Sequence, residues 1–402
     1  MTTSLNVLML GWEFPPHISG GLGTACKGLV DGLTTREVPV TFVVPRLDPE
    51  LSADDPRVVD CGLDSSGPNL VPVASALLPY LTEEQYRRLA VRRSASGSVA
   101  ATLLEEVERY ARAVDDNTKG VYQIVHAHDW MTVPAAIAVS GRLQIPFVFH
   151  VHSTEYDRAG ESANRDIAAI EQRGLDAAAR VICVSRYTTQ QVRSRYQVDP
   201  EKLRVVHNAV APSSEATSMK PLERLREPIV LFLARVTFQK GPNYFLEAAA
   251  RVVAQEPRVK FVMAGGGDLL PAMIERAAEL GLARHVHFTG FLRGAEVDRM
   301  YDEASLFVLP SVSEPFGIAP LEALARNVPV IVSRQSGVVE VLENVQAVDF
   351  WNVEELAERI LDVLRRPDLA QGRTDEAREE LRRLTWERQA GRVIDVYREL
   401  LA

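Results

Sequence analysis

The stretch SLFVLPSVSEPFGIAPLEAL, residues 305–324, decides the fold of this chain. Its first six residues are apolar and β-prone, and a helical pattern follows, so the stretch predicts a strand followed by a helix. Pro320 is tolerated only in the first turn of a helix, and we therefore expect the helix to begin near Phe316 to Ile318. The backbone amides there would lie at the positive end of the helix dipole, an arrangement that suits a phosphate.

Two glutamates flank this helix start. Glu314 precedes the helix, and Glu322 lies about 7 Å further along its axis at 1.5 Å per residue. Gly317, between them, lets an anion approach the backbone closely. This spacing predicts a nucleotide-sugar site, in which one carboxylate faces the sugar and the other the ribose.

Short β-prone runs alternate with helical patterns along the chain, which is typical of parallel sheets covered by helices. The expected strands are residues 6–10, 39–44, 121–126, 146–150, 180–184 and 203–207, and then 229–234, 260–264, 285–289, 305–309 and 329–332. We predict an α/β protein of two doubly wound, Rossmann-like domains that face one another across a cleft. Such sheets bind ligands at the carboxyl ends of their strands.

The two halves are separated by residues 211–228, which contain Pro, Ser and alternating charges without apolar periodicity and indicate a linker. We therefore place one domain in residues 1–210 and the other in residues 229–384. Residues 45–81 are rich in Pro, Asp, Ser and Gly and predict loops or short irregular strands.

The composition limits the possible partners. The 54 acidic residues outnumber the 45 basic ones, and the net charge of −9 argues against nucleic-acid binding and offers no polybasic membrane patch. The N-terminus has an apolar run with no basic region before it, so we expect a first strand, no signal peptide and no membrane-spanning segment. The three cysteines are scattered and support neither disulfides nor a zinc site, which favours a cytoplasmic setting.

Loops at two strand ends of the second half carry groups that suit a nucleotide. Arg235 follows the strand 229–234, and Lys240 precedes an expected helix start at Gly241. Both cations therefore lie at the carboxyl end of one strand, where they suit a diphosphate. Phe291 follows another strand and offers its ring or backbone to a base.

Two glycine-rich turns precede expected helices. Gly20, Gly21 and Gly23 leave helix-start amides that can bind a phosphate or a sugar across the cleft. Residues 265–267 are three glycines that precede Asp268, the expected N-cap of the next helix. Glycine turns of this kind are common, so each is a weak signal by itself.

Polar residues gather at a strand end of the first half. The run VHAHDW contains His128, Asp129 and Trp130, and an aromatic ring beside an acid suits sugar stacking and hydroxyl recognition. His126 and His128, at alternate strand positions, raise the question of a metal site. No third ligand is evident nearby, and we predict no metal.

The next strand ends add further polar groups. The run FHVHSTEYDR contains His152, the best candidate for a group beside the reacting sugar, and Glu155, a candidate for the acceptor side. Ser185 follows the next strand and is interpreted first as a helix N-cap.

Together these motifs resemble retaining GT-B glycosyltransferases, and most of all the glycogen or starch synthase-like members of family 4. The likeness covers nearly the whole chain and rests on the segments already named, together with VVHNAV, LARVTFQKGP, AGGGD and TGFLRG. It implies a nucleotide-sugar donor as co-substrate, bound mainly by the second domain, and no cofactor or metal.

The resemblance also implies individual roles. Arg235 and Lys240 would neutralise the diphosphate, and the backbone at Phe291 would meet the base. Glu322 would hold the ribose and Glu314 the hydroxyls of the donor sugar.

The first domain, by the same resemblance, carries the acceptor side. His152 would contribute a carbonyl and an imidazole near the reacting carbon. The last helix, residues 385–402, would cross back to this domain. We predict the acceptor contacts at His128, Asp129, Trp130 and Glu155.

The donor and the acceptor stay open at this point. Bacterial glycogen synthases carry Lys-x-Gly-Gly-Leu-Gly-Asp near the N-terminus, whereas this chain has Ile18 and Thr24 in place of the Lys and the Asp. We expect transfer of a hexosyl group, first of all glucosyl, to a glucan or other sugar hydroxyl with retention of configuration. The alternatives are a mannosyl- or other hexosyltransferase of glycoconjugate synthesis, a nucleotide-sugar epimerase on the same architecture, and a non-catalytic glucan-binding protein. The sequence does not indicate an oligomeric state.

Overall fold

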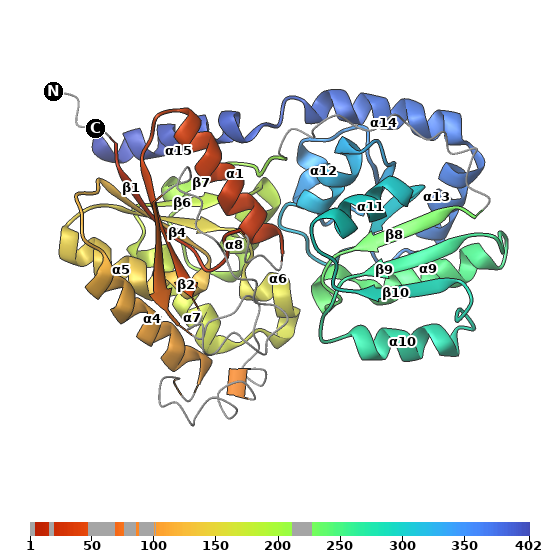
Figure 1. Cartoon of the computed structure of the whole chain (residues 1–402), viewed down its shortest axis with the longest axis horizontal. Coiled ribbons are helices and arrows are strands. Elements are labelled where there is room, and N and C mark those ends of the chain that lie inside the picture. The colour runs from red at the N-terminus through yellow and green to blue at the C-terminus, as the bar shows by residue number, and fades with distance from the viewer. Residues whose placement is uncertain are drawn as a thin grey trace.

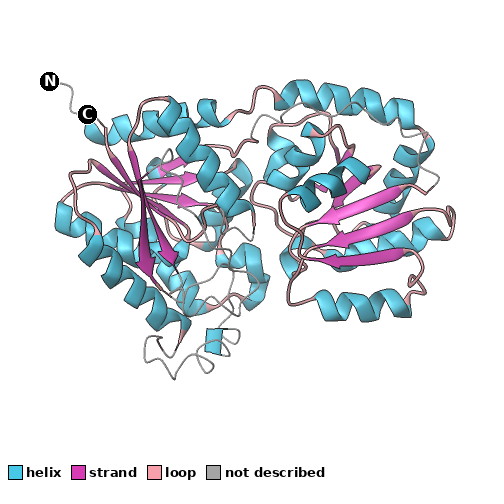
Figure 2. Ribbon diagram, in the orientation of Figure 1, coloured by secondary structure: helices cyan, strands magenta, loops and turns pink. Residues whose placement is uncertain are grey.

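The computed structural model describes residues 5–15, 20–46, 69–75, 86–87, 100, 102–210 and 227–402. They form two α/β domains, seen side by side in Figure 1 and coloured by secondary structure in Figure 2. Most of the expected linker and of the segment 45–81 lies outside the described residues, as does Ile18.

The N-terminal domain has a parallel sheet of seven strands in the order β3-β2-β1-β4-β5-β6-β7. These strands are β1 Val7–Leu10, β2 Val40–Arg46, β3 Asn69–Ala74, β4 Ile124–His128, β5 Phe147–Val151, β6 Arg180–Cys183 and β7 Leu203–Val205. The helices are α1 Gly21–Thr35, α4 Leu103–Asn117, α5 Val133–Leu143, α6 Glu155–Ala159, α7 Arg165–Ala177 and α8 Arg186–Arg195.

The C-terminal domain repeats this plan with six parallel strands in the order β10-β9-β8-β11-β12-β13. They are β8 Ile229–Leu233, β9 Lys260–Ala264, β10 Val286–Gly290, β11 Leu306–Leu309, β12 Val330–Ser333 and β13 Gln346–Val348. The helices are α9 Pro242–Val253, α10 Leu270–Glu279, α11 Ala295–Glu303, α12 Ile318–Ala325, α13 Val353–Arg365, α14 Pro367–Leu381 and α15 Trp386–Leu401. Both sheets reverse their strand order beside the first strand, which confirms the predicted pair of doubly wound domains.

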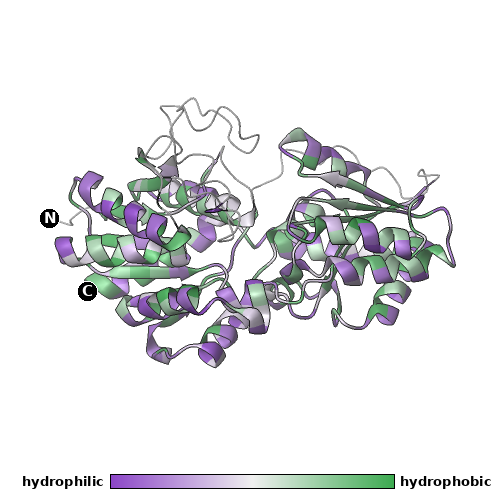
Figure 3. Ribbon diagram, turned by 90° about the horizontal axis from the view of Figure 1, so that it is seen from below, coloured by the Kyte–Doolittle hydropathy of each residue, from purple (hydrophilic) through white to green (hydrophobic). Residues whose placement is uncertain are grey.

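The cores follow from the apolar strands. All four residues of β11, LFVL, are buried, and Figure 3 shows helices that alternate between hydrophobic and hydrophilic stretches around mostly hydrophobic strands. In α13, for example, Leu356 and Ile360 are buried while Glu354 and Glu358 are exposed. None of the described helices is long and apolar enough to cross a bilayer.

The last helix, α15, packs on the N-terminal domain, while α14 covers the C-terminal one (Figure 1). It lies so close to α1 that a Cβ at Gly28 would be 2.2 Å from the ring of Trp386, and one at Gly32 would be 2.6 Å from the Trp386 carbonyl oxygen. At its far end, the buried Tyr397 hydroxyl lies 2.6 Å from Nδ1 of His126. The chain thus crosses between the domains a second time.

Three local expectations need correction. The segment 45–81 contains β3, a regular edge strand paired with β2, and β13 is a further strand that the sequence did not suggest. The strand expected at 121–126 is β4, shifted to Ile124–His128, because it ends only where Asp129 takes a positive φ of 57°. Asp268 is not an N-cap, since α10 begins at Leu270 and Leu269 is the cap residue.

Candidate functional site

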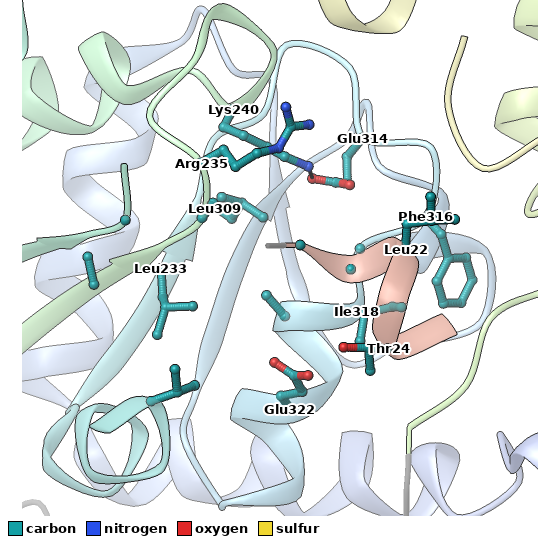
Figure 4. A pocket seen from close by; sticks show the side chains of 18 of the residues that line it. Leu22, Thr24, Leu233, Arg235, Lys240, Leu309, Glu314, Phe316, Ile318 and Glu322 are labelled. Carbon is teal, nitrogen blue, oxygen red and sulfur yellow. Dashed lines mark hydrogen bonds and ion pairs between the residues drawn. The ribbon is translucent and has the colours of Figure 1, made fainter. Parts of the chain in front are cut away.

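A cavity of about 870 Å³ lies between the two domains, beyond the carboxyl ends of strands from both sheets. Figure 4 shows part of its lining. The lining includes most of the predicted site residues, namely Gly20, Gly21, Asp129, His152, Arg235, Lys240, Phe291, Glu314, Phe316, Gly317, Ile318 and Glu322. The fold therefore brings motifs from both halves of the sequence to one cavity.

The start of α12 forms part of the C-terminal wall. The helix begins at Ile318, within the range predicted from Pro320, and its N-cap Gly317 has a φ of +104°. Only glycine adopts this conformation without strain, and a Cβ there would also lie 3.3 Å from Cγ of Glu314. No described side chain caps this helix start, so its first-turn amides can bind an anion that enters from the cavity.

A buried ion pair lies beside this helix start. Nζ of Lys240 donates a hydrogen bond to Oε2 of Glu314 at 2.6 Å, and Oγ of Ser311 donates to the same oxygen at 3.0 Å. The side chains of Lys240 and Glu314 are only 15% and 7% exposed. The tight turn after Lys240 requires glycine, because Gly241 has a φ of +64° and a Cβ there would lie 2.1 Å from the Pro310 carbonyl oxygen.

Arg235 is the second cation of this wall. It follows β8, and its Nη2 donates to Oε1 of Gln239 at 3.2 Å. The buried Gln239 in turn donates from Nε2 to Oγ of Ser153, at 3.4 Å, in the N-terminal domain. The guanidinium is therefore held at the cavity by a side chain that also bridges the two domains.

Glu322 lies within α12 and lines the same cavity (Figure 4). The hydroxyl of Tyr301 donates to its Oε2 at 3.0 Å. Burial raises the pKa of Glu322, and the hydrogen bond from Tyr301 opposes that rise. A buried carboxylate with one fixed donor retains acceptor positions for hydroxyl groups of a ligand.

Two more loops complete the C-terminal wall. Gly265 has a φ of +138°, and a Cβ there would lie 1.9 Å from the Ala234 carbonyl oxygen, so the loops after β8 and β9 touch through their backbones. Phe291 is 46% exposed, and the Arg293 guanidinium lies 5.4 Å from the centre of its ring. An exposed ring beside a cation is suited to stacking on a planar base.

The N-terminal wall contributes the start of α1 and the end of β5. Leu22 and Thr24 of α1 lie across from Ile318 in Figure 4, and the amide of Gly23 donates to Oε2 of the buried Glu13 at 2.9 Å. The amide of Gly23 therefore holds the start of α1 through Glu13, and Gly23 does not itself line the cavity.

His152 follows β5 and lines the same cavity. Its backbone amide donates to Oδ1 of Asp129 at 2.7 Å, and its Nε2 lies 2.9 Å from Nδ1 of His128. Burial lowers the pKa of His152 to about 3, so the imidazole is neutral near pH 7. Burial likewise raises the pKa of Asp129 to about 6.

Three residues predicted to bind the acceptor lie elsewhere. His128 and Trp130 are 0% and 4% exposed, because the end of β4 turns both side chains into the domain. Glu155 is 8% exposed, and its Oε2 accepts a hydrogen bond from Nε of Arg158 at 3.1 Å. None of the three lines the cavity, and only Asp129 of the predicted acceptor set does so.

The chain matches two family profiles that together span most of its length. Residues 19–214 match Glycosyltransferase Family 4, and residues 213–380 match Glycosyl transferases group 1. The chain is a GT-B glycosyltransferase of family 4. The resemblance to GT-B glycosyltransferases of family 4 is confirmed, and the protein is a transferase enzyme.

Relatives of this glycosyltransferase cover most of its length. An uncharacterized glycosyltransferase of Methanocaldococcus jannaschii is 28% identical over 85% of this chain and 83% of its own. Glycogen synthase of Mycobacterium tuberculosis is 25% identical over 94% of this chain and 90% of its own. A D-inositol 3-phosphate glycosyltransferase of a Mycobacterium species is 30% identical over 56% of this chain and 54% of its own.

Solved structures share the fold. Sucrose-phosphate synthase from Thermosynechococcus elongatus superposes with a TM-score of 0.73 at 22% identity and covers 99% of both chains. HepE of Anabaena, solved in complex with UDP and glucose, superposes with a TM-score of 0.72 at 16% identity over 98% of this chain and 100% of its own.

The two domains of this glycosyltransferase also meet directly beside the cavity. Ser185 caps α8, as predicted, by accepting from the Thr188 amide at 2.8 Å. Its hydroxyl also donates to the Pro315 carbonyl oxygen, at 2.5 Å, in the C-terminal domain. This second contact could not be predicted from the sequence, because the partners are 130 positions apart.

A carboxylate of the C-terminal domain adds to this contact. Glu340 accepts hydrogen bonds from the backbone amides of Arg186 and Tyr187 at 2.8 and 2.6 Å, at the start of α8. Nε2 of His207 lies 3.1 Å from the same carboxylate. We call this set of contacts at Ser185, Pro315 and Glu340 the seam between the domains.

Proposed function

We propose that this enzyme transfers a glucosyl group from a nucleotide-diphosphate glucose to a hydroxyl group of a glucan or another sugar, with retention of anomeric configuration. The observation that carries the proposal is the C-terminal wall. There, two cations, a helix start without a side-chain cap and two carboxylates surround one cavity.

The donor diphosphate fits beside Lys240, Arg235 and the first-turn amides of α12. Cations and aligned amides stabilise the negative charge that develops on a departing diphosphate, and one such group typically contributes about 10²–10³ in rate. Nζ of Lys240 is paired with Glu314 at 2.6 Å. We propose that Lys240 turns towards the phosphate when the donor binds and that Glu314 then accepts hydrogen bonds from sugar hydroxyls.

The ribose fits beside Glu322 and the base beside the exposed ring of Phe291. The reacting carbon of the sugar would then lie near His152, whose neutral imidazole can donate or accept a hydrogen bond without adding charge to an oxocarbenium-like transition state. We propose no covalent nucleophile and no metal for the transfer. The glycosidic bond to the diphosphate breaks, the acceptor oxygen bonds to the same face of the carbon, and the leaving phosphate takes the acceptor proton.

The relatives support the choice of glucose. Glycogen synthase is among the proteins to which nearly the whole chain is similar, and HepE, which shares the fold, was solved with UDP and glucose. The acceptor side rests on Asp129, because the other predicted contacts do not line the cavity.

The test is a donor screen. We would incubate the enzyme with UDP-glucose, ADP-glucose or GDP-mannose, with and without maltooligosaccharide, and measure nucleoside diphosphate release and the anomeric configuration of the product by NMR. We expect release with a glucose donor, dependent on the acceptor, and an α-linked product. Turnover with GDP-mannose but with neither glucose donor would support the mannosyl alternative. Interconversion of the donor sugar without acceptor would indicate an epimerase, and acceptor binding without turnover a glucan-binding protein.

A further inference from the structure

Four of the eight histidines of the chain gather in one cluster beneath the N-terminal wall, at the ends of β4 and β5. We propose that three of them, His126, His128 and His150, form a binding site for one divalent transition-metal ion of the zinc type. His128 of the site lies next to His152, and the ion itself would not touch the reacting groups of the transfer proposed above.

The three ligands come from neighbouring strands. His126 and His128 point to the same face of β4, and His150 of β5 pairs in register with His128. One nitrogen of each ring lies within 4.8 Å of the other two, and Nε2 of His126 is 3.0 Å from Nδ1 of His150. Two nitrogens bound to one tetrahedral zinc ion are about 3.3 Å apart, from Zn–N distances of about 2.05 Å. A small inward turn of the rings therefore completes the site.

Two of the three remaining ring nitrogens have hydrogen-bond partners, as in a metal centre. Nδ1 of His126 lies 2.6 Å from the Tyr397 hydroxyl, and Nδ1 of His128 lies 2.9 Å from Nε2 of His152. Histidines that bind a metal through one ring nitrogen usually hydrogen-bond through the other, which fixes the ring. Tyr397 and His152 would act as these outer partners.

Two nitrogens of the cluster are buried without a partner. Within the described part of the chain, Nε2 of His128 and Nε2 of His150 have no hydrogen-bond partner. A buried polar atom left unpaired carries a free-energy cost, so two in one cluster call for an explanation. An ion that accepts the lone pair of His128 removes at least one of these costs.

The burial and the local charge agree with a metal. His126, His128 and His150 are 0%, 0% and 3% exposed, and imidazole is a ligand that suits zinc, cobalt, nickel and copper. Asp129, buried directly after His128, supplies a negative charge at the same strand end.

The ion would act on His152 through His128. An ion on Nε2 of His128 leaves the ring proton on Nδ1, which must then donate to Nε2 of His152. His152 would in turn carry its own proton on Nδ1. The importance of this tautomer of His152 rests on the proposed function, whereas the metal site does not depend on that function.

The experiment measures metal content and needs no assay of activity. The purified full-length enzyme would be stripped with EDTA, reloaded with Zn²⁺ or Co²⁺, freed of excess ion by gel filtration and analysed by plasma mass spectrometry. We expect about one ion per chain, and for Co²⁺ the visible absorption bands of a site with nitrogen ligands. Fewer than 0.2 ions per chain after reloading would overturn the proposal, and the cluster would then be a hydrogen-bonded array only.

Variants locate the ion. His150→Gln should lower the retained metal at least fivefold, while His287→Gln, at an exposed histidine of β10, should leave it unchanged. Retention of the full metal content by His150→Gln would place the ion elsewhere and overturn the proposal. If His150→Gln does not fold, Tyr397→Phe replaces it, and we expect its affinity for Co²⁺ to fall about 10–100-fold. An unchanged affinity in Tyr397→Phe would count against the site.

Discussion

The two walls of the cleft are built on the same kind of sheet, yet they present their polar groups differently. On the C-terminal wall, Lys240, Glu314 and Gly317 lie in loops beyond the strands and line the cavity. On the N-terminal wall, His126 and His128 lie within the last residues of β4 and are fully buried. The difference is that these loop residues of the C-terminal wall reach the cleft, whereas these two residues of β4 are covered by the N-terminal domain.

The strongest test of this contrast is Lys240→Ala, which removes a cation from the C-terminal wall. We expect kcat to fall about 10²–10³-fold, because the charge that develops on the leaving diphosphate loses a partner. The variant also leaves the buried Glu314 without its ion pair, so the midpoint of thermal unfolding should fall as well. Steady-state kinetics with the donor identified by the screen would measure the first effect and calorimetry the second.

Lys260→Ala is the matched control, because Lys260 is a cation at the start of β9 that does not line the cavity. Its kcat should stay within a factor of two of the wild-type value. Full turnover by Lys240→Ala would show that the C-terminal wall does not stabilise the leaving group and would remove the main support of the proposed function.

The sequence predicts one wall better than the other for a physical reason. Pro320 restricts where α12 can begin, and this local rule was sufficient to place the amides and both glutamates. The orientation of Trp130 depends instead on Asp129, whose positive φ ends β4 two residues later than the apolar pattern suggests. No short-range pattern reports that shift.

Contacts between side chains that lie far apart in the sequence could not be predicted from local patterns. His150 becomes a neighbour of His126 only because β4 and β5 are adjacent in the sheet, and for that reason the sequence did not show a third histidine near His126 and His128. Alternating strands and helices nevertheless predicted both domains, since each helix satisfies its own backbone hydrogen bonds and packs an apolar face against the sheet.

A second test addresses the stability of the N-terminal wall, which depends on the last helix. Gly32→Ala should lower the free energy of unfolding by about 1–3 kcal/mol, because its Cβ would be 2.6 Å from a backbone oxygen of Trp386 and α1 must move away from α15. Urea unfolding followed by circular dichroism would measure the change.

Gly372→Ala in α14 gives the opposite expectation. A Cβ there meets nothing within 4 Å, so alanine should stabilise the helix by up to about 1 kcal/mol. If both variants were equally stable, the close contact between α1 and α15 would not limit the packing of this wall.

A third test returns to the C-terminal wall with a change that adds only a methyl group. Gly317→Ala forces alanine into a φ of +104° and brings its Cβ to 3.3 Å from Cγ of Glu314. The left-handed conformation costs about 1–2 kcal/mol. We expect the Kd for the donor nucleotide, measured by calorimetry, to rise about tenfold as the helix start shifts, at 1.4 kcal/mol for each factor of ten.

Gly281→Ala is the control that separates the effect of backbone strain on stability from an effect on nucleotide binding. Gly281 has a φ of +70° beyond the end of α10, with nothing within 4 Å of a Cβ, so the substitution should destabilise the domain without changing the Kd. Equal affinities of Gly317→Ala and the wild-type enzyme would contradict the role of the α12 amides in phosphate binding.

The smallest effect is expected at the seam, where the two walls meet. The pKa of Glu340 is lowered: burial alone would raise it, but hydrogen bonds from His207 and from the amides of Arg186 and Tyr187 outweigh burial. Because the pKa of Glu340 is lowered, its charged form stabilises the contact between the domains at every pH above the ordinary glutamate pKa of about 4.3. This stabilisation is lost as the pH falls through the lowered pKa of Glu340. Glu340→Gln removes the charge and should weaken the seam by about 0.5–1.5 kcal/mol.

Small-angle scattering can detect this loss as a larger radius of gyration, caused by opening of the cleft while each domain stays folded. The wild-type enzyme should open in the same way below about pH 4.3, the ordinary pKa of a glutamate, whereas Glu340→Gln should already be more open at pH 7 and respond less to acid. Glu343→Gln, at an exposed position three residues further on, should behave like the wild-type enzyme. A radius of gyration that is the same in Glu340→Gln and the wild-type enzyme at pH 7 would mean that Ser185 and Gln239 hold the two walls together without this carboxylate.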